Sequence, residues 1–177
     1  MTQKILYLRN HDSEWAFEDR RLEGNSEFED GAELILAPGR TSIADVPASI
    51  ASLYAVTYAP YIGDILFYAP DEFVPVDELE GVASASAPGG YLRIGHAGEF
   101  SVFLGRQFEN ILVFDPIYFN HGAESGIAMA CESLYEFVND VALGPRYREL
   151  FGPVDLQGDR WWSTSSWYSY LEELGWT

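Results

Sequence analysis

The chain has 177 residues, 47% of them hydrophobic and 15% aromatic, and a formal net charge of −18 from 28 acidic and 10 basic residues. This length and apolar content favour one packed domain, residues 1–177, and argue against intrinsic disorder. Because the charge is so negative, we expect the chain to be repelled by nucleic acids and anionic membranes and attracted to a basic partner. An acidic surface that serves solubility alone is the alternative.

The cysteine content and the N-terminus indicate a compartment. Cys131 is the single cysteine, so no intramolecular disulfide can form, and a reducing compartment is the simple interpretation. The N-terminal residues lack the cleavage pattern of a signal peptide, and no window approaches the roughly 20 apolar residues that a membrane span needs. We therefore expect a cytoplasmic protein without contact to the membrane.

The first 44 residues are predicted to form an N-terminal extension. Lys4–Arg9 has the pattern of a short strand, and Ala32–Ala37 that of a second strand, which Pro38-Gly39 ends. In the charged stretch between them, the apolar residues fit neither the helical period nor the strand period well. This stretch is predicted to be a loop with one short helix around Ser13–Leu22.

The middle of the chain, residues 45–145, begins with a helix pattern. Apolar residues recur at helical spacing over Asp45–Tyr58, after the opening Asp45-Val46-Pro47. Phe73–Val76 is predicted to be an edge segment because it contains a proline. A second helix is predicted over Ile127–Val141, with Cys131 on its apolar face, and Gly144-Pro145 ends it. The remaining runs have strand patterns: Ile65–Tyr68, Tyr91–Ile94, Phe100–Leu104 and Ile111–Phe114.

The tail, residues 146–177, is rich in aromatic residues. Ser166–Leu174 is predicted to be a helix that packs against the core through Trp167, Tyr170, Leu171 and Leu174. Trp161 and Trp162 are adjacent, so on a strand only one of them can face the core, and the other is a candidate partner contact.

The order of these elements resembles the SMI1/KNR4 (SUKH) superfamily over residues 45–145. Asp45–Ile50 is similar to the opening of the family's first helix, and Gly63–Tyr68 to its Gly turn and strand. Asp71–Leu79 resembles the family's acidic-aromatic segment, Tyr91–Leu104 its hairpin, and Ser133–Val138 its Ser-x-x-Glu-Phe-Val helix. Residues 1–44 and 146–177 have no obvious counterpart in the family.

The resemblance implies both a fold and a function. It implies an α+β fold with a single mixed or antiparallel sheet of about five or six strands, flanked by helices. Many bacterial members of this superfamily are immunity proteins that bind and neutralise toxins, so a binding role is implied as well.

The residue spacings favour a protein that is not an enzyme and needs no cofactor. His11, His96 and His121 are far apart and fit no metal-ligand spacing, so they are interpreted as polar loop residues. No nucleophile elbow, phosphate-binding loop or EF-hand spacing occurs. A catalytic role for Cys131 is not favoured, since a free cysteine on an apolar face behaves as a small hydrophobic residue.

The charges are distributed unevenly along the chain. Residues 45–81 hold seven acidic residues and no Lys or Arg. Nuclease toxins tend to be basic because they bind phosphate, and an acidic inhibitor can occupy such a site and steer its own association. A well-solvated surface patch is the alternative. The candidate contact set is Asp64, Asp71, Glu72, Asp77, Glu78 and one of Trp161 and Trp162.

The sequence thus predicts an acidic immunity protein that blocks a cognate toxin, most readily a basic, nuclease-like one, by direct binding. A DNA mimic or regulatory inhibitor that occupies a nucleic-acid-binding groove is the second hypothesis. A small hydrolase that uses Asp or His is the third, and it would require convergent polar groups in a deep pocket.

Overall fold

The computed structural model describes residues 1–11, 33–41, 43, 46–79, 90–115, 126–152 and 160–177. Within these residues, eight strands form one sheet in the order β1-β2-β3-β5-β6-β7-β8, and β4 pairs with β5. All pairings are antiparallel. The strands are β1 (Glu33–Pro38), β2 (Thr57–Gly63), β3 (Ile65–Phe67), β4 (Val74–Pro75), β5 (Tyr91–Ala97), β6 (Phe100–Gly105), β7 (Ile111–Phe114) and β8 (Ile127–Cys131).

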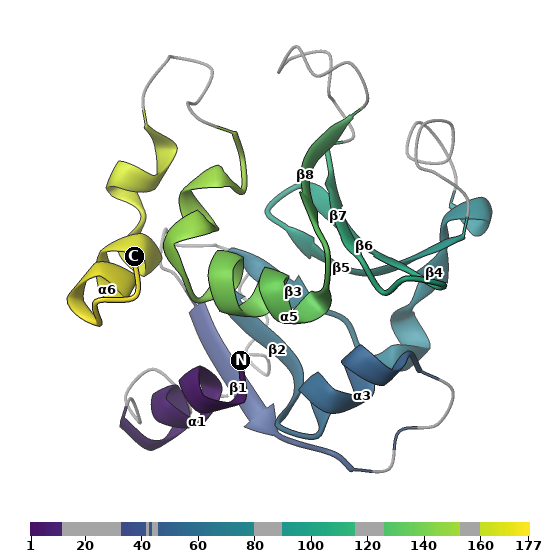
Figure 1. Cartoon of the computed structure of the whole chain (residues 1–177), viewed down its shortest axis with the longest axis horizontal. Coiled ribbons are helices and arrows are strands. Elements are labelled where there is room, and N and C mark those ends of the chain that lie inside the picture. Colours follow the sequence, from purple (N-terminus) through teal and green to yellow (C-terminus); the bar gives the residue numbers. More distant parts are fainter. Residues whose placement is uncertain (12–32, 42, 44–45, 80–89, 116–125, 153–159) are drawn as a thin grey trace, which may run out of the picture.

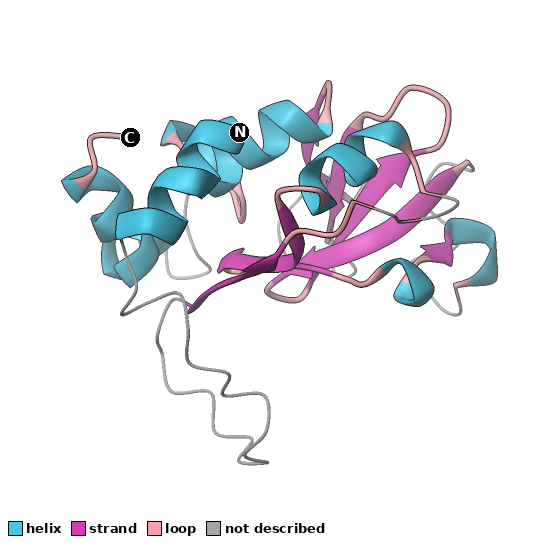
Figure 2. Ribbon diagram, turned by 90° about the horizontal axis from the view of Figure 1, so that it is seen from below, coloured by secondary structure: helices cyan, strands magenta, loops and turns pink. Residues whose placement is uncertain are grey.

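The α-helices lie together on one side of the sheet (Figure 2). The α-helices are α1 (Thr2–His11), α3 (Ala48–Tyr54), α5 (Leu134–Glu136) and α6 (Ser166–Glu173). The shorter helical turns are η2 (Pro70–Glu72), η3 (Val76–Glu78), η5 (Phe137–Ala142, a π-helical continuation of α5), η6 (Pro145–Glu149) and η7 (Trp161–Thr164). The predicted α+β class is confirmed, but the sheet has more strands than the five or six predicted.

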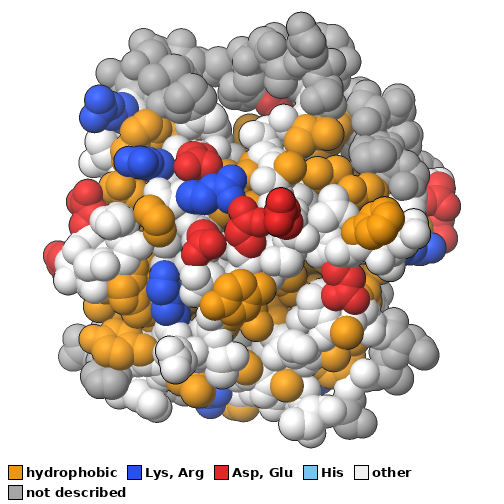
Figure 3. All heavy atoms as spheres, in the orientation of Figure 1, with side chains coloured by type: hydrophobic (Ala, Val, Ile, Leu, Met, Phe, Trp, Pro, Cys, Tyr) orange, Lys and Arg blue, Asp and Glu red, His pale blue; other side chains and the backbone are white. Residues whose placement is uncertain are grey.

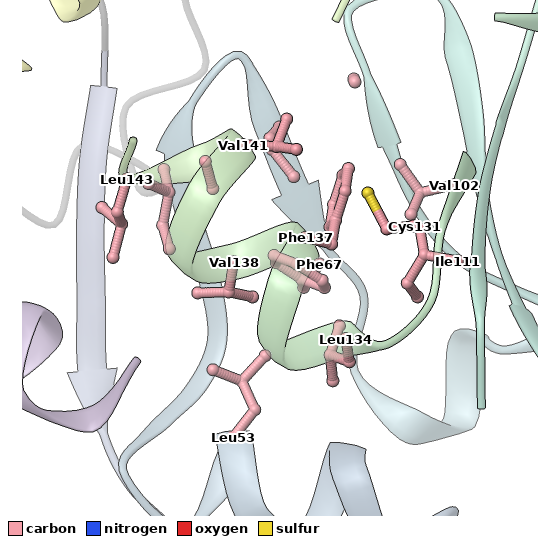
Figure 4. Packing of buried hydrophobic residues seen from close by; sticks show 14 of the residues in the cluster. Leu53, Phe67, Val102, Ile111, Cys131, Leu134, Phe137, Val138, Val141 and Leu143 are labelled. Carbon is pink, nitrogen blue, oxygen red and sulfur yellow. The ribbon is translucent and has the colours of Figure 1, made fainter. Parts of the chain in front are cut away.

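The main core lies between the sheet and these helices. Phe67 of β3 meets Phe137 of η5 edge-on, with ring centroids 6.2 Å apart. Figure 4 shows Cys131 pointing inward beside Phe137 and Val102. Ile5 of the N-terminal extension and Leu171 of the tail are fully buried in the same cluster. Both regions without a counterpart in the resembled family therefore contribute residues to the main core.

A second, smaller cluster lies on the opposite face of the sheet. Its buried members are Val76, Phe103, Leu112 and Phe114. Phe103 is in register with Leu112, and cross-strand partners project from the same face of a sheet. This opposite face is therefore apolar at one end, and η3 contributes Val76 to it.

The predicted strand at Lys4–Arg9 is wrong, because these residues belong to helix α1. Ile5 and Leu8 are fully buried, whereas Leu6 and Tyr7 are about 40% exposed, which is the pattern of one helical face rather than of alternation. Lys4 then donates from Nζ to the carbonyl oxygens of Asn139 and Leu143, 3.0 and 2.6 Å away. A positive charge is favourable at the C-terminal end of η5, where these carbonyl groups lie. The two hydrogen bonds also join α1 to η5.

The predicted helix at Asp45–Tyr58 is shorter, and it is followed by strand β2. Pro60 interrupts the helix pattern but does not prevent the strand, because two residues of β2, Ala59 and Pro60, oppose Leu36 alone on β1. Ala59 has a φ of 43° at this bulge. A bulge absorbs a residue without a backbone N–H, so the proline costs no ladder hydrogen bond.

The predicted helix at Ile127–Val141 is also partly wrong. Ile127–Cys131 pairs with β7 as strand β8, so Cys131 lies on a strand and not on a helix face. The helix begins after Ser133, whose Oγ accepts a hydrogen bond from the backbone N–H of Glu136, 3.1 Å away. A run of five small or apolar residues fits the helical period as well as the strand period, and the pairing with β7 makes it a strand.

The other predicted elements have mixed outcomes. The predicted strands at Ala32–Ala37, Ile65–Tyr68, Tyr91–Ile94, Phe100–Leu104 and Ile111–Phe114 are confirmed as β1, β3, β5, β6 and β7, and Phe73–Val76 contains β4. The predicted C-terminal helix is α6, with Trp167 and Leu171 buried. Trp161 and Trp162 lie on the 3₁₀ turn η7 and not on a strand. The helix predicted around Ser13–Leu22 lies outside the described residues.

Candidate functional site

The carboxylates predicted to contact a partner lie mostly on an interrupted strand beside β5. β3 pairs with β5 through Ile65–Phe67, and the backbone N–H of Tyr68 continues the ladder to the Ile94 carbonyl, 2.9 Å away. The chain then leaves the sheet as η2 and returns as β4, where Val74 opposes Arg93. We call the stretch from Pro70 to Glu78, which comprises η2, β4 and η3, the acidic segment.

Local hydrogen bonds and burial fix the shape of the acidic segment. Pro70 begins η2, where a proline fits because no N–H is required. The Glu72 carboxylate accepts a hydrogen bond from the backbone N–H of Ala69, 2.9 Å away. Val76 is 2% exposed and anchors η3 in the second cluster. The segment is therefore held at both of its helical turns.

Four carboxylates project from this segment into solvent. Asp71, Glu72, Asp77 and Glu78 are all exposed, and none of them forms an ion pair with a described residue. Like charges on one short segment repel one another, and a partner that brings cations would relieve this repulsion. The acidic segment can therefore attract and orient a basic surface.

Asp64 belongs to a different part of the molecule. It lies in the turn between β2 and β3, at the far end of β3 from the acidic segment. Its Oδ2 accepts a hydrogen bond from the hydroxyl of Tyr147, which is fully buried. Burial, followed by the charge of Asp64, raises the pKa of Tyr147 above its usual range. The structure thus gives Asp64 a contact within the fold.

The two predicted tryptophan contacts also lie away from the acidic segment. Trp161 is half-buried, and its ring packs edge-on against Phe151 at 4.7 Å. Its Nε1 donates to the Gly152 carbonyl oxygen, 2.9 Å away. Trp162 is half-buried beside Trp161. In Figure 1 the C-terminal α6 and strand β4 lie at opposite ends of the longest axis. The predicted contact residues therefore do not form one patch.

The structure shows a polar cluster that the sequence reasoning missed. The predicted loop position of His96 is wrong, because this residue lies on β5 and is half-buried. Its Nδ1 is 3.0 Å from the hydroxyl of Tyr68, and the Arg93 guanidinium carbon is 5.8 Å from the centre of the same Tyr68 ring. Burial, followed by the charge of Arg93, lowers the pKa of His96. We call these three residues the Arg93 cluster.

Cys131 has the environment of a structural cysteine. Burial raises the pKa of its thiol to about 11, so the reactive thiolate is scarce at neutral pH. Arg146 is 3.9 Å from the sulfur but also pairs with Glu136 and Glu149. Among the described residues no group of three or more His, Cys, Asp or Glu could hold a metal ion. His121 and the side chain of His11 lie outside the described part of the chain.

The sequence matches no protein-family model and shows no significant similarity to a curated protein or to a solved structure. The resemblance to the SMI1/KNR4 superfamily therefore remains a prediction. Within the described residues, no helix combines the length and the apolar character needed to cross a bilayer.

Proposed function

We propose that this chain is a non-enzymatic protein that binds and inhibits a basic protein partner through the acidic segment. An immunity protein that neutralises a nuclease-like toxin is the specific form of this proposal. The observation that carries it is the group of four exposed carboxylates, on a segment with fixed ends, that no described Lys or Arg neutralises. The resemblance of Asp71–Leu79 to the acidic-aromatic segment of the SMI1/KNR4 superfamily is in accord with it.

We expect these carboxylates to affect the association rate and the choice of partner more than the affinity. An exposed ion pair is individually weak, because water screens it and two side chains lose freedom. A field from several acids nevertheless raises the rate at which a basic surface approaches and disfavours acidic competitors. We therefore expect association that slows steeply with salt, together with dissociation that depends on apolar contacts elsewhere in the interface.

The test compares two charge-reversal variants with equal net charge. The first carries Asp71→Lys, Asp77→Lys and Glu78→Lys, and it spares Glu72, which caps η2. The matched control carries Lys at three exposed acids away from the acidic segment, Glu99, Glu172 and Glu173. Each protein is immobilised and exposed to lysate of the source organism at low and at high salt, and bound proteins are identified by mass spectrometry.

The outcomes separate the hypotheses. Recovery of one basic toxin-like protein by the wild type and the control, with loss in the acidic-segment variant and at high salt, supports the proposal. Association rates measured with that purified protein should fall about tenfold or more in the acidic-segment variant. Equal binding by both variants would remove the acidic segment from the interface. Recovery of a nucleic-acid-binding host factor would favour the regulatory inhibitor instead.

A further inference from the structure

Phe108 is the most exposed large hydrophobic side chain in the described part of the chain. It is 76% exposed and lies on the turn that joins β6 to β7. A single exposed apolar residue is common on protein surfaces and does not by itself mark an interface. Two other features distinguish Phe108: its turn is held in one position, and this turn lies at the same end of the sheet as part of the acidic segment.

Hydrogen bonds within the turn and to a neighbouring helix hold this turn in position. The backbone N–H of Glu109 donates to the Gly105 carbonyl oxygen, 2.9 Å away. The Glu109 carboxylate also accepts hydrogen bonds from the backbone N–H groups of Ala48 and Ser49, 3.2 and 2.9 Å away, and so joins the turn to the start of α3. Glu109 has a φ of 53°, a conformation that is unfavourable for a residue other than glycine and persists only where its surroundings hold it. Phe108 therefore projects from an ordered turn, whose backbone loses little freedom on binding.

The strand register places this turn at the same end of the sheet as η3. Pro75, the last residue of β4, opposes Leu92, and β4 runs toward the end of β5 at which Tyr91 lies. Tyr91 is in register with Gly105, the last residue of β6, and the turn that carries Phe108 follows. Only β5 lies between β4 and β6, which corresponds to about 10 Å at the usual spacing of neighbouring strands. An interface of ordinary size, about 800 Å² on each partner, can therefore include both η3 and the turn.

We propose that Phe108 is the apolar anchor of the interface that the acidic segment forms, and that its ring enters an apolar pocket bordered by Lys or Arg side chains on a basic protein. This inference rests on the proposed function and deepens it, because the carboxylates account for the approach of a partner but not for its retention. Aromatic residues are enriched in protein interfaces, and a few deeply buried side chains account for most of the affinity. Asp77 and Glu78 are exposed on η3 and supply the negative charges that face the border of the pocket.

Arg106 tests the position of the interface separately from the anchor. It is exposed on the same turn, two residues before Phe108, and its positive charge opposes the approach of a basic partner. Arg106→Glu should therefore raise the association rate severalfold at low salt and leave the dissociation rate nearly unchanged. An association rate equal to that of the wild type would place the partner away from this turn.

The test of the anchor measures dissociation of the full chain from the purified protein that the wild type captures. Phe108→Ala is compared with Leu6→Ala, which truncates another exposed apolar side chain, 41% exposed on α1 and far from β4 in Figure 1. We expect Phe108→Ala to dissociate about tenfold or more faster than the wild type, and Leu6→Ala to dissociate at the wild-type rate. Because Phe108 is exposed, Phe108→Ala should unfold at the same urea concentration as the wild type, so the faster dissociation is not a loss of fold. In a second readout, the photoreactive analogue p-benzoylphenylalanine replaces Phe108 and should crosslink to the same basic protein in lysate.

The outcomes distinguish the anchor from the proposed function. A basic partner that associates slowly with the acidic-segment variant, but dissociates from Phe108→Ala at the wild-type rate, would overturn the anchor and leave the proposed function in place. A protein that crosslinks to position 108 but is not basic, and associates at a rate independent of salt, would overturn the class of partner. Failure of the wild type to capture a basic protein would refute the proposed function, and the anchor with it.

Discussion

The contact between Tyr147 and Asp64 provides a direct test of whether Asp64 serves the fold. In Tyr147→Phe the ring stays, with its neighbours Trp161 and Tyr168, and only the hydroxyl that donates to Asp64 is lost. A hydrogen bond to a charged group contributes about 1.5–3 kcal/mol to the free energy of unfolding. Asp64 is only half-buried, so water can replace the lost donor in part. We therefore expect a loss of about 1–2 kcal/mol in the free energy of unfolding.

Urea unfolding, monitored by far-ultraviolet circular dichroism, measures this loss. The matched control is Tyr168→Phe, which removes a hydroxyl from a half-buried tyrosine that stacks on Tyr147. For a chain of this length, 1 kcal/mol corresponds to roughly 2–4 °C in the melting temperature, so both readouts can resolve the effect. Asp64→Asn, alone and combined with Tyr147→Phe, gives the coupling energy between the two side chains.

One outcome would refute the reasoning. If Tyr147→Phe and Tyr168→Phe are equally stable, or if the coupling energy between positions 64 and 147 is zero, then the hydroxyl contributes nothing to the fold. Asp64 would then be as free for a partner as the acids on η2 and η3. A clear coupling energy would instead remove Asp64 from the partner-binding set on energetic grounds.

Three further substitutions probe other parts of the fold. Gly63→Ala should lower the free energy of unfolding in urea by more than about 2 kcal/mol, because Gly63 has a φ of 61° and a Cβ there would lie 2.4 Å from Trp167. A smaller loss would show that α6 can shift away. Ser133→Ala should lose about 1 kcal/mol with the cap of α5, whereas Ser133→Thr should keep most of it, and equal losses would argue against capping. His96 has a lowered pKa in the folded state, so its unfolded form binds more protons, and stability should fall as the pH drops below about 6.5; the variant His96→Gln should not show this component, and identical pH curves would contradict it.

The sequence allowed the prediction of those elements in which local pattern and long-range pairing agree. Strands β5 to β7 and helix α6 are examples, because apolar period and boundary residues indicate the same structure in each. Helix α1 was mispredicted because its short apolar run fits a strand as well as a helix, and only packing against η5 decides between them. Strand β2 was missed because the bulge that accommodates Pro60 depends on its pairing with β1.

The candidate site shows the same division. The acidic segment was predictable, because a run of acids without Lys or Arg is visible in the sequence and its residues remain adjacent in space. The Arg93 cluster was not, because β5 changes register between Arg93 and Gly95, and this irregularity alters which side chains share a face. Tyr68 joins the cluster from another strand, so no sequence spacing indicates it.

The basic residues explain why so much negative charge remains available to a partner. Arg9 donates to the Val56 carbonyl oxygen, 3.0 Å away, and the Arg40 guanidinium carbon is 3.8 Å from the centre of the Tyr58 ring. In the described part of the chain, only Arg146 forms ion pairs with acids, over α5 and η6, where Figure 3 shows acidic and basic side chains side by side. Among the described residues, Lys4, Arg9 and Arg40 thus contact carbonyl oxygens or a ring, and most carboxylates form no ion pair.

This division of roles gives salt two opposite effects. Screening reduces the self-repulsion of a chain with a net charge of −18, so added salt should raise the free energy of unfolding. The same screening should slow association with a basic partner. The free energy of unfolding and the association rate should therefore be measured over one series of salt concentrations. A negative charge that serves recognition changes both quantities, whereas a charge that only destabilises the fold changes the first alone. A partner whose association rate does not change across that series would not be recognised through the acidic segment.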